Sequence, residues 1–69
     1  MGKSLGEALP EEMARVRDEV MPAYREVGAP GAFALEMMRQ ALDGAAKALA
    51  GGDTIAAAHW YGELKGFSL

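Results

Sequence analysis

Three stretches of the chain repeat apolar residues at intervals of three or four positions, which is the spacing of an amphipathic helix. They cover about residues 9–27, 31–50 and 54–65, and no stretch alternates apolar and polar residues as a strand would. Short loops join the three stretches. The pattern therefore predicts an all-α fold, a small three-helix domain in which a kinked first helix packs on an antiparallel helical hairpin.

The first helix is expected to carry a single apolar stripe. The stripe consists of Leu9, Met13, Val16, Val20, Tyr24 and Val27. Pro22 has no N–H to donate to the carbonyl of Asp18, so it should kink the helix or split it near Met21. The charged residues of this stretch, Arg15 among them, are expected to point away from the stripe.

The second and third helices are expected to form the hairpin. Gly51 and Gly52 can adopt the left-handed conformation that ends a helix. Asp53 then stands at the position where a side-chain oxygen accepts the first free N–H groups of the next helix. The last helix should pack through a face made of Ala57, Trp60, Tyr61 and Leu64, with Phe67 at its edge.

The central helix has two apolar stripes. The first consists of Ala34, Met38, Leu42, Ala45 and Leu49, and the second of Phe33, Met37, Ala41, Gly44 and Ala48. One neighbouring helix can cover one stripe, so two stripes indicate a neighbour on each side. The pattern leaves open which stripe is buried in the monomer, and it favours Phe33 and Met37 as a pair that faces another chain.

The short length and the composition of the chain favour self-association. The 69 residues suffice for one domain at most, and 14 of the hydrophobic residues are alanine, which buries little area. There is no cysteine to form a disulfide staple. We expect a flexible lead-in at residues 1–8, a single helical domain at residues 9–69, and a homodimer or larger assembly.

The charge and hydropathy of the chain argue against nucleic acids and membranes as direct partners. The net charge is −3, and the basic residues are interleaved with acidic ones, so no basic stripe for direct nucleic-acid binding is present. No apolar run approaches the roughly 20 residues of a membrane span. The first residues lack the hydrophobic stretch of a secretion signal. These features predict a cytoplasmic protein that does not bind a membrane.

The sequence offers few residues that could form a catalytic or metal-binding site. His59 is the single imidazole, and Glu63 follows it by one helical turn, but two groups are too few for a metal site or a catalytic constellation. Glu36 and Asp43 share a helix face, yet a di-iron site would also need Glu-x-x-His pairs. We therefore predict no catalytic residue, no metal, no cofactor and no enzymatic activity.

Protein binding is the remaining candidate activity. Trp60 and Tyr61 are adjacent and cannot both point inward, and aromatic side chains are common anchors of interfaces. Methionine adapts well to irregular binding surfaces. The candidate protein-interface residues are Tyr24, Phe33, Met37, Ala41, Gly44, His59 and Trp60.

Segments spread over residues 9–66 resemble small proteins carried by phages and prophages of proteobacteria. The segments are LPEEM and RVR at residues 9–13 and 15–17, GAFA at 31–34, GD at 52–53 and YGELK at 61–65. The resemblance implies an accessory protein that acts in the host cytoplasm by binding a host protein and inhibiting or modulating it. It assigns no role to any residue. Two alternatives stay open: a structural homo-oligomer used in assembly or packaging, and an acidic decoy of a nucleic-acid-binding protein.

Overall fold

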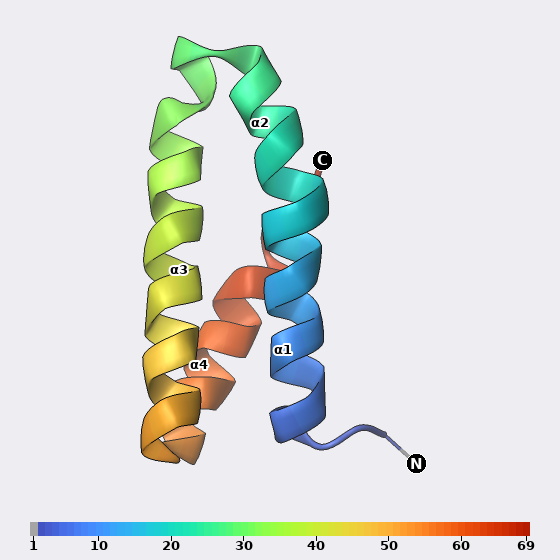
Figure 1. The fold of residues 1–69 in the computed structure, drawn as a ribbon, viewed down its shortest axis with the longest axis vertical. Helices are drawn as coiled ribbons and strands as arrows, with labels where there is room; N and C mark the ends of the chain where they lie inside the picture. Colours follow the sequence, from blue (N-terminus) through green and yellow to red (C-terminus); the bar gives the residue numbers. More distant parts are fainter. Residues whose placement is uncertain (1) are drawn as a thin grey trace.

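The computed structural model describes residues 2–69 and confirms the all-α, three-helix prediction (Figure 1). Met1, the first residue of the predicted lead-in, lies outside the described residues. No strand occurs in the part of the chain that is described. The elements in order are α1 (Leu5–Arg15), the π-helical η1 (Val16–Val20), α2 (Met21–Val27), the 3-10 turn η2 (Ala29–Gly31), α3 (Ala32–Gly51) and α4 (Thr54–Lys65).

Elements α1, η1 and α2 form one continuous rod that runs antiparallel to α3 (Figure 1). The rod passes Pro22 without a break because the preceding turn is π-helical, with the N–H of Met21 donating to the carbonyl of Val16. Regular α-helix resumes at Met21, the place where the sequence predicts the disturbance. The rod ends at Gly28, whose φ of 83° is readily adopted only by glycine.

The first helix begins at Leu5, four residues before the predicted start. The prediction of a lead-in is therefore wrong for residues 5–8. Ser4 accepts the backbone N–H of Glu7 at 3.0 Å, and its hydroxyl lies 3.2 Å from the carboxylate of Glu7. The side chain of Leu5 packs against the core, and this contact outweighs the low helix propensity of the neighbouring Gly6.

The turn between α3 and α4 follows the prediction closely. Gly52 adopts the left-handed conformation with φ of 66°, and the N–H of Asp53 reaches back to the carbonyl of Ala48 at 2.9 Å. The carboxylate of Asp53 accepts the N–H of Ala56 at 3.0 Å, as an N-cap should. The predicted range of the last helix, 54–65, matches α4.

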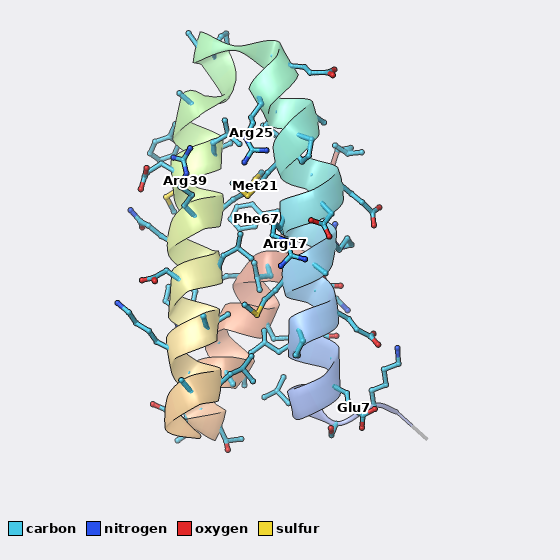
Figure 2. All side chains as sticks on the ribbon, viewed as in Figure 1. Glu7, Arg17, Met21, Arg25, Arg39 and Phe67 are labelled. Atoms are coloured by element: carbon cyan, nitrogen blue, oxygen red, sulfur yellow. The ribbon has the colours of Figure 1, made fainter. Side chains whose placement is uncertain are left out.

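The core lies where the rod, α3 and α4 meet. Its buried residues are Leu9, Val16, Val20, Met21, Leu35, Met38, Ala41, Ala45, Ala48, Ala57 and Leu64. Figure 2 shows Met21 and Phe67 pointing into the space between α3 and the rod. Four of the eleven core residues are alanine, so the helices approach closely but each contact removes little apolar area from water.

Helix α4 is too short to cover the whole of α3. At 1.5 Å per residue, the 20 residues of α3 span about 30 Å and the 12 residues of α4 about 18 Å. Figure 1 shows α4 starting at the C-terminal end of α3 and crossing toward the rod. The N-terminal half of α3 therefore has the rod on one side and no third helix on the other.

Candidate protein-binding surface on α3 and α4

Phe33 and Met37 lie on the uncovered half of α3. Phe33 is 77 % exposed and Met37 is 41 % exposed. Phe33 and Gly44 are eleven residues apart, as are Met37 and Ala48, which places each pair about 20° apart around the helix. The two exposed side chains therefore continue, beyond the end of α4, the same face that α4 covers further along α3.

The predicted second stripe of α3 is thus divided between surface and core. Ala41 is only 1 % exposed and belongs to the core, so its assignment to a protein interface is wrong. Ala48 is also buried. The prediction failed at Ala41 because helical spacing gives the direction of a side chain but not the length of the helix that covers it.

Gly44 and Trp60 form a close contact between α3 and α4. The indole of Trp60 lies across Gly44, and a Cβ added at residue 44 would stand 2.5 Å from Cζ2 of the ring. His59 packs its ring edge-on against Trp60, with ring centroids 4.8 Å apart. His59 itself is exposed and lies 3.9 Å from Glu63. Gly44 therefore serves a contact within the chain, while Trp60 keeps part of its ring at the surface.

A shallow open hollow of about 580 Å³ lies over this contact. It is lined by Gln40, Asp43, Gly44, Lys47, Ala48, Gly51, Asp53, Ala56 and Trp60. Its floor is made of small residues and the indole, and its rim is polar. We call Phe33, Met37 and this hollow together the α3/α4 surface. Sequence reasoning missed the contribution of Gly51 and Ala56, whose small size is the signal that marks them.

Tyr24 packs at the edge of the core and binds the end of the chain. It is half-buried, and its hydroxyl donates to the carbonyl of Ser68 at 3.1 Å. This bond ties the end of the chain to α2, in agreement with the position of the C-terminus beside the rod in Figure 1. Tyr24 thus holds the chain end and is not part of the α3/α4 surface.

Arg15 is a structural residue whose role the sequence analysis did not identify. Its Nη2 donates to the carbonyls of Leu64 at 3.0 Å and Phe67 at 2.9 Å, just where α4 ends. Its Nε donates to the carboxylate of Glu12 at 2.9 Å. A guanidinium satisfies free carbonyls at a helix C-terminus and interacts favourably with the helix dipole there.

One ion pair on the rod shifts the pKa of its carboxyl group. The Arg17 guanidinium donates to Asp18, and this hydrogen bond lowers the pKa of the Asp18 carboxyl below its usual value. Both side chains are exposed and lie on η1. Within residues 2–69, no three His, Cys, Asp or Glu side chains come together in a group that could hold a metal ion. None of the helices in that range has the length and hydropathy needed to cross a membrane.

Substitutions of two glycines by alanine should have opposite effects. Gly44→Ala forces the indole of Trp60 to move, at an overpacking cost of about 1–3 kcal/mol, and gains about 1 kcal/mol of helix propensity. We expect a net loss of about 1 kcal/mol in the free energy of unfolding, measured in urea by the fluorescence of the single tryptophan.

Gly62→Ala is the control for this measurement. Gly62 lies inside α4, and an added Cβ would meet nothing within 4 Å. It should therefore stabilise the protein by about 0.5–1 kcal/mol. Equal effects of the two substitutions would contradict the close contact between Gly44 and Trp60.

No protein-family model, curated protein or solved structure matches this chain. The assignment of a function therefore depends on the surface itself. Its features are two protruding apolar side chains, a hollow of small residues beside them and a polar rim.

Proposed function

We propose that this chain is a non-enzymatic protein-binding module that acts through the α3/α4 surface. The observation that carries the proposal is the exposure of Phe33 and Met37 in line with the hollow over Gly44 and Trp60. Burying a large apolar side chain is worth about 1.5–3 kcal/mol, so these two residues would supply a substantial part of a binding energy. An apolar centre with a polar rim is the usual anatomy of an interface.

The target we propose is a host protein, which the module inhibits or modulates. The support for this step is the resemblance of several segments of the sequence to accessory proteins of phages and prophages. A module of this kind needs only to occupy a surface of its target. Trp60, partly exposed beside the hollow, is the natural aromatic anchor for such a contact.

The acidic decoy has weaker support. A decoy needs carboxylates gathered on one face, where they can imitate phosphates. Several of the carboxylates in this chain instead have a basic partner close by. These ion pairs are Lys3–Glu11, Arg15–Glu12, Arg17–Asp18, Arg39–Glu36 and Lys47–Asp43.

A photo-crosslinking amino acid at position 33 tests the proposal in bacterial host cells. Benzoylphenylalanine keeps the aromatic character of Phe33 and reacts with whatever lies against it. We expect covalent adducts between this variant and one discrete host protein. Prior expression of the unlabelled wild-type chain should reduce them, because both compete for one target.

Position 55 provides the matched control. Ile55 is also a large exposed apolar residue, 86 % accessible, but it lies outside the α3/α4 surface. The same probe at position 55 should not give the adduct found at position 33. Adducts of position 33 with this chain alone would favour the structural homo-oligomer. The absence of any adduct, or identical adducts at both positions, would contradict the proposed function.

A further inference from the structure

We infer that the face of the molecule opposite α4 binds an acidic amphipathic helix of a partner protein. This face lies between α3 and the rod, and we call it the arginine face. Its exposed and half-buried residues are Met13, Arg17, Arg25, Arg39, Leu42 and Leu49. It does not include Phe33 or Met37, so it is a second binding surface that does not depend on the proposed function.

Three arginines lie on this face. Arg15 bonds to the end of α4, and Arg17, two residues further along, points to roughly the opposite side of the rod. Arg25 follows Arg17 by two helical turns and therefore lies on the same side. Figure 2 shows Arg17 and Arg25 on the near side of the rod, with Arg25 extending into the interval between the helices and Arg39 on the near side of α3. Helix α4 passes behind α3 in the same view (Figure 1).

The carboxylates nearest to these arginines in the sequence lie to the side of the face. Asp18 and Glu26 each directly follow an arginine, which turns them about 100° away around the helix. The ion pairs Arg17–Asp18 and Arg39–Glu36 leave more than half of each arginine side chain exposed. Arg25 is exposed and has no ion-pair partner within residues 2–69. A chain of net charge −3 thus has a locally positive face, which is complementary to carboxylates.

A line of leucines runs along the same side of α3. Leu35, Leu42 and Leu49 follow one another at seven-residue spacing, which is the contact pattern of packed helices. Leu42 lies about 160° around α3 from Gly44, the residue that faces α4. Exposure rises along the line, from 9 % at Leu35 to 36 % at Leu49. On the facing rod, Met13 is half-buried and packs against the core. The arginines therefore border an apolar seam that another helix can cover.

A hollow of about 180 Å³ lies at the far end of this seam, between the start of α1 and the end of α3. Leu5, Gly6 and Leu49 are among the residues that line it. Leu5 and Arg25 are 20 residues apart along the rod, or about 30 Å. A partner helix of about 20 residues would place an apolar side chain in the hollow and its carboxylates beside the arginines. An amphipathic helix laid between two others is a recurrent mode of peptide recognition.

A nucleic acid fits this face less well than an acidic helix does. A polyanion gains its affinity from many phosphate contacts, and the face offers three arginines on a chain that is negative as a whole. A nucleic acid backbone also has no apolar side to cover the leucines. The combination of cations with an apolar seam matches a helix that has both carboxylates and leucines.

Two designed peptides of 20 residues test this assignment on the full chain. Both have leucines at heptad spacing, and the flanking positions are glutamates in one peptide and lysines in the other. Fluorescence anisotropy of the labelled peptides measures their dissociation constants. We expect the glutamate peptide alone to bind, and to bind more weakly as salt is raised. No binding of the glutamate peptide, or equal binding of the lysine peptide, would overturn the inference.

Arg39→Glu and Lys47→Glu are a matched pair of variants for this measurement. Both cations are exposed on α3 and pair with a carboxylate one helical turn before them, but Lys47 lies about 80° away from Arg39 around the helix. Arg25→Glu and Arg39→Glu should each raise the dissociation constant of the glutamate peptide at least about tenfold, and Lys47→Glu less than about threefold. Circular dichroism checks that each variant is folded. Equal effects of Arg39→Glu and Lys47→Glu would indicate general charge attraction and overturn the inference.

Amide chemical shifts in NMR spectra locate the bound peptide. They should change around Met13, Arg25 and Leu42. Changes confined to Phe33 and Met37 would place the peptide on the α3/α4 surface and overturn the assignment of the arginine face. A single-stranded DNA of 20 nucleotides that bound more tightly than the glutamate peptide, and lost its binding in Arg25→Glu, would assign the face to nucleic acid instead.

The two proposals can fail separately. A position-33 probe that captures a host protein, in a chain to which the glutamate peptide does not bind, would overturn the arginine face and leave the proposed function intact. Binding of the glutamate peptide that depends on Arg25, in a chain whose position-33 probe captures nothing, would support the arginine face and contradict the proposed function.

Discussion

Replacement of Leu64 by alanine is expected to lower the free energy of unfolding by about 2–5 kcal/mol. Leu64 is fully buried and, with Ala57, supplies the buried contacts of α4. A chain of this length is expected to have a total stability of only about 3–10 kcal/mol, so the loss would remove much of it. Urea denaturation followed by far-ultraviolet circular dichroism measures the effect.

Ile55→Ala on the same helix is the matched control for Leu64→Ala. Both substitutions remove a branched aliphatic side chain, but Ile55 is exposed and alanine has the higher helix propensity. Ile55→Ala should therefore change stability by less than about 0.5 kcal/mol. The two variants are compared at one protein concentration, because self-association would make the apparent stability depend on concentration. Similar effects of the two substitutions would mean that the facing of α4 described above is incorrect.

The hairpin could be predicted from the sequence because its signals are local. Gly52 and Asp53 each act through backbone groups within a few residues, so their meaning does not depend on the rest of the fold. The packing face of α4 could be predicted for a related reason. Both its buried and its exposed residues follow simple helical spacing, with Leu64 inside and Ile55 outside.

The rod was harder to predict because Pro22 changes the helix geometry before it. A π-helical turn contains one more residue than an α-helical turn, so the residues after it rotate around the axis relative to an unbroken helix. Met21, which the sequence analysis did not place in the apolar stripe, is consequently buried, while Val27 is 59 % exposed. A uniform spacing of 3.6 residues cannot anticipate this shift.

The candidate site could not be predicted in full from the sequence. Its extent depends on the length of α4 and on the angle at which α4 crosses α3, and helical periodicity contains neither. The structure divides the second predicted stripe of α3 between core and surface. The point where it passes from core to surface, between Ala41 and Met37, is set by how far α4 extends and where it crosses. The role of Arg15 was missed for a similar reason, because its partners at Leu64 and Phe67 lie about fifty residues away in sequence.

Substitution of Arg15 is the second change for which we expect a large loss of stability. Arg15→Ala removes two charge-assisted hydrogen bonds to the carbonyls at the end of α4 and one to Glu12. Such bonds contribute about 1.5–3 kcal/mol each when buried, but the Arg15 side chain is 31 % exposed, so we expect a total loss of about 2–3 kcal/mol. Urea unfolding measures the loss, and faster amide exchange at the end of α4 should accompany it.

Arg17→Ala is the control that shows whether a loss of stability comes from the position of Arg15 or from the removal of any positive charge on the rod. It removes the same charge from the same rod, but Arg17 is exposed and, among residues 2–69, its side chain bonds only to its neighbour Asp18, so stability should hardly change. Arg15→Lys should recover only part of the loss, because an ammonium group cannot span both carbonyls and Glu12 with the planar geometry of a guanidinium. If Arg15→Ala proved as mild as Arg17→Ala, the C-terminal carbonyls would be equally well satisfied by water. The end of α4 would then be held by the packing of Phe67 against the core and by the bond from Tyr24.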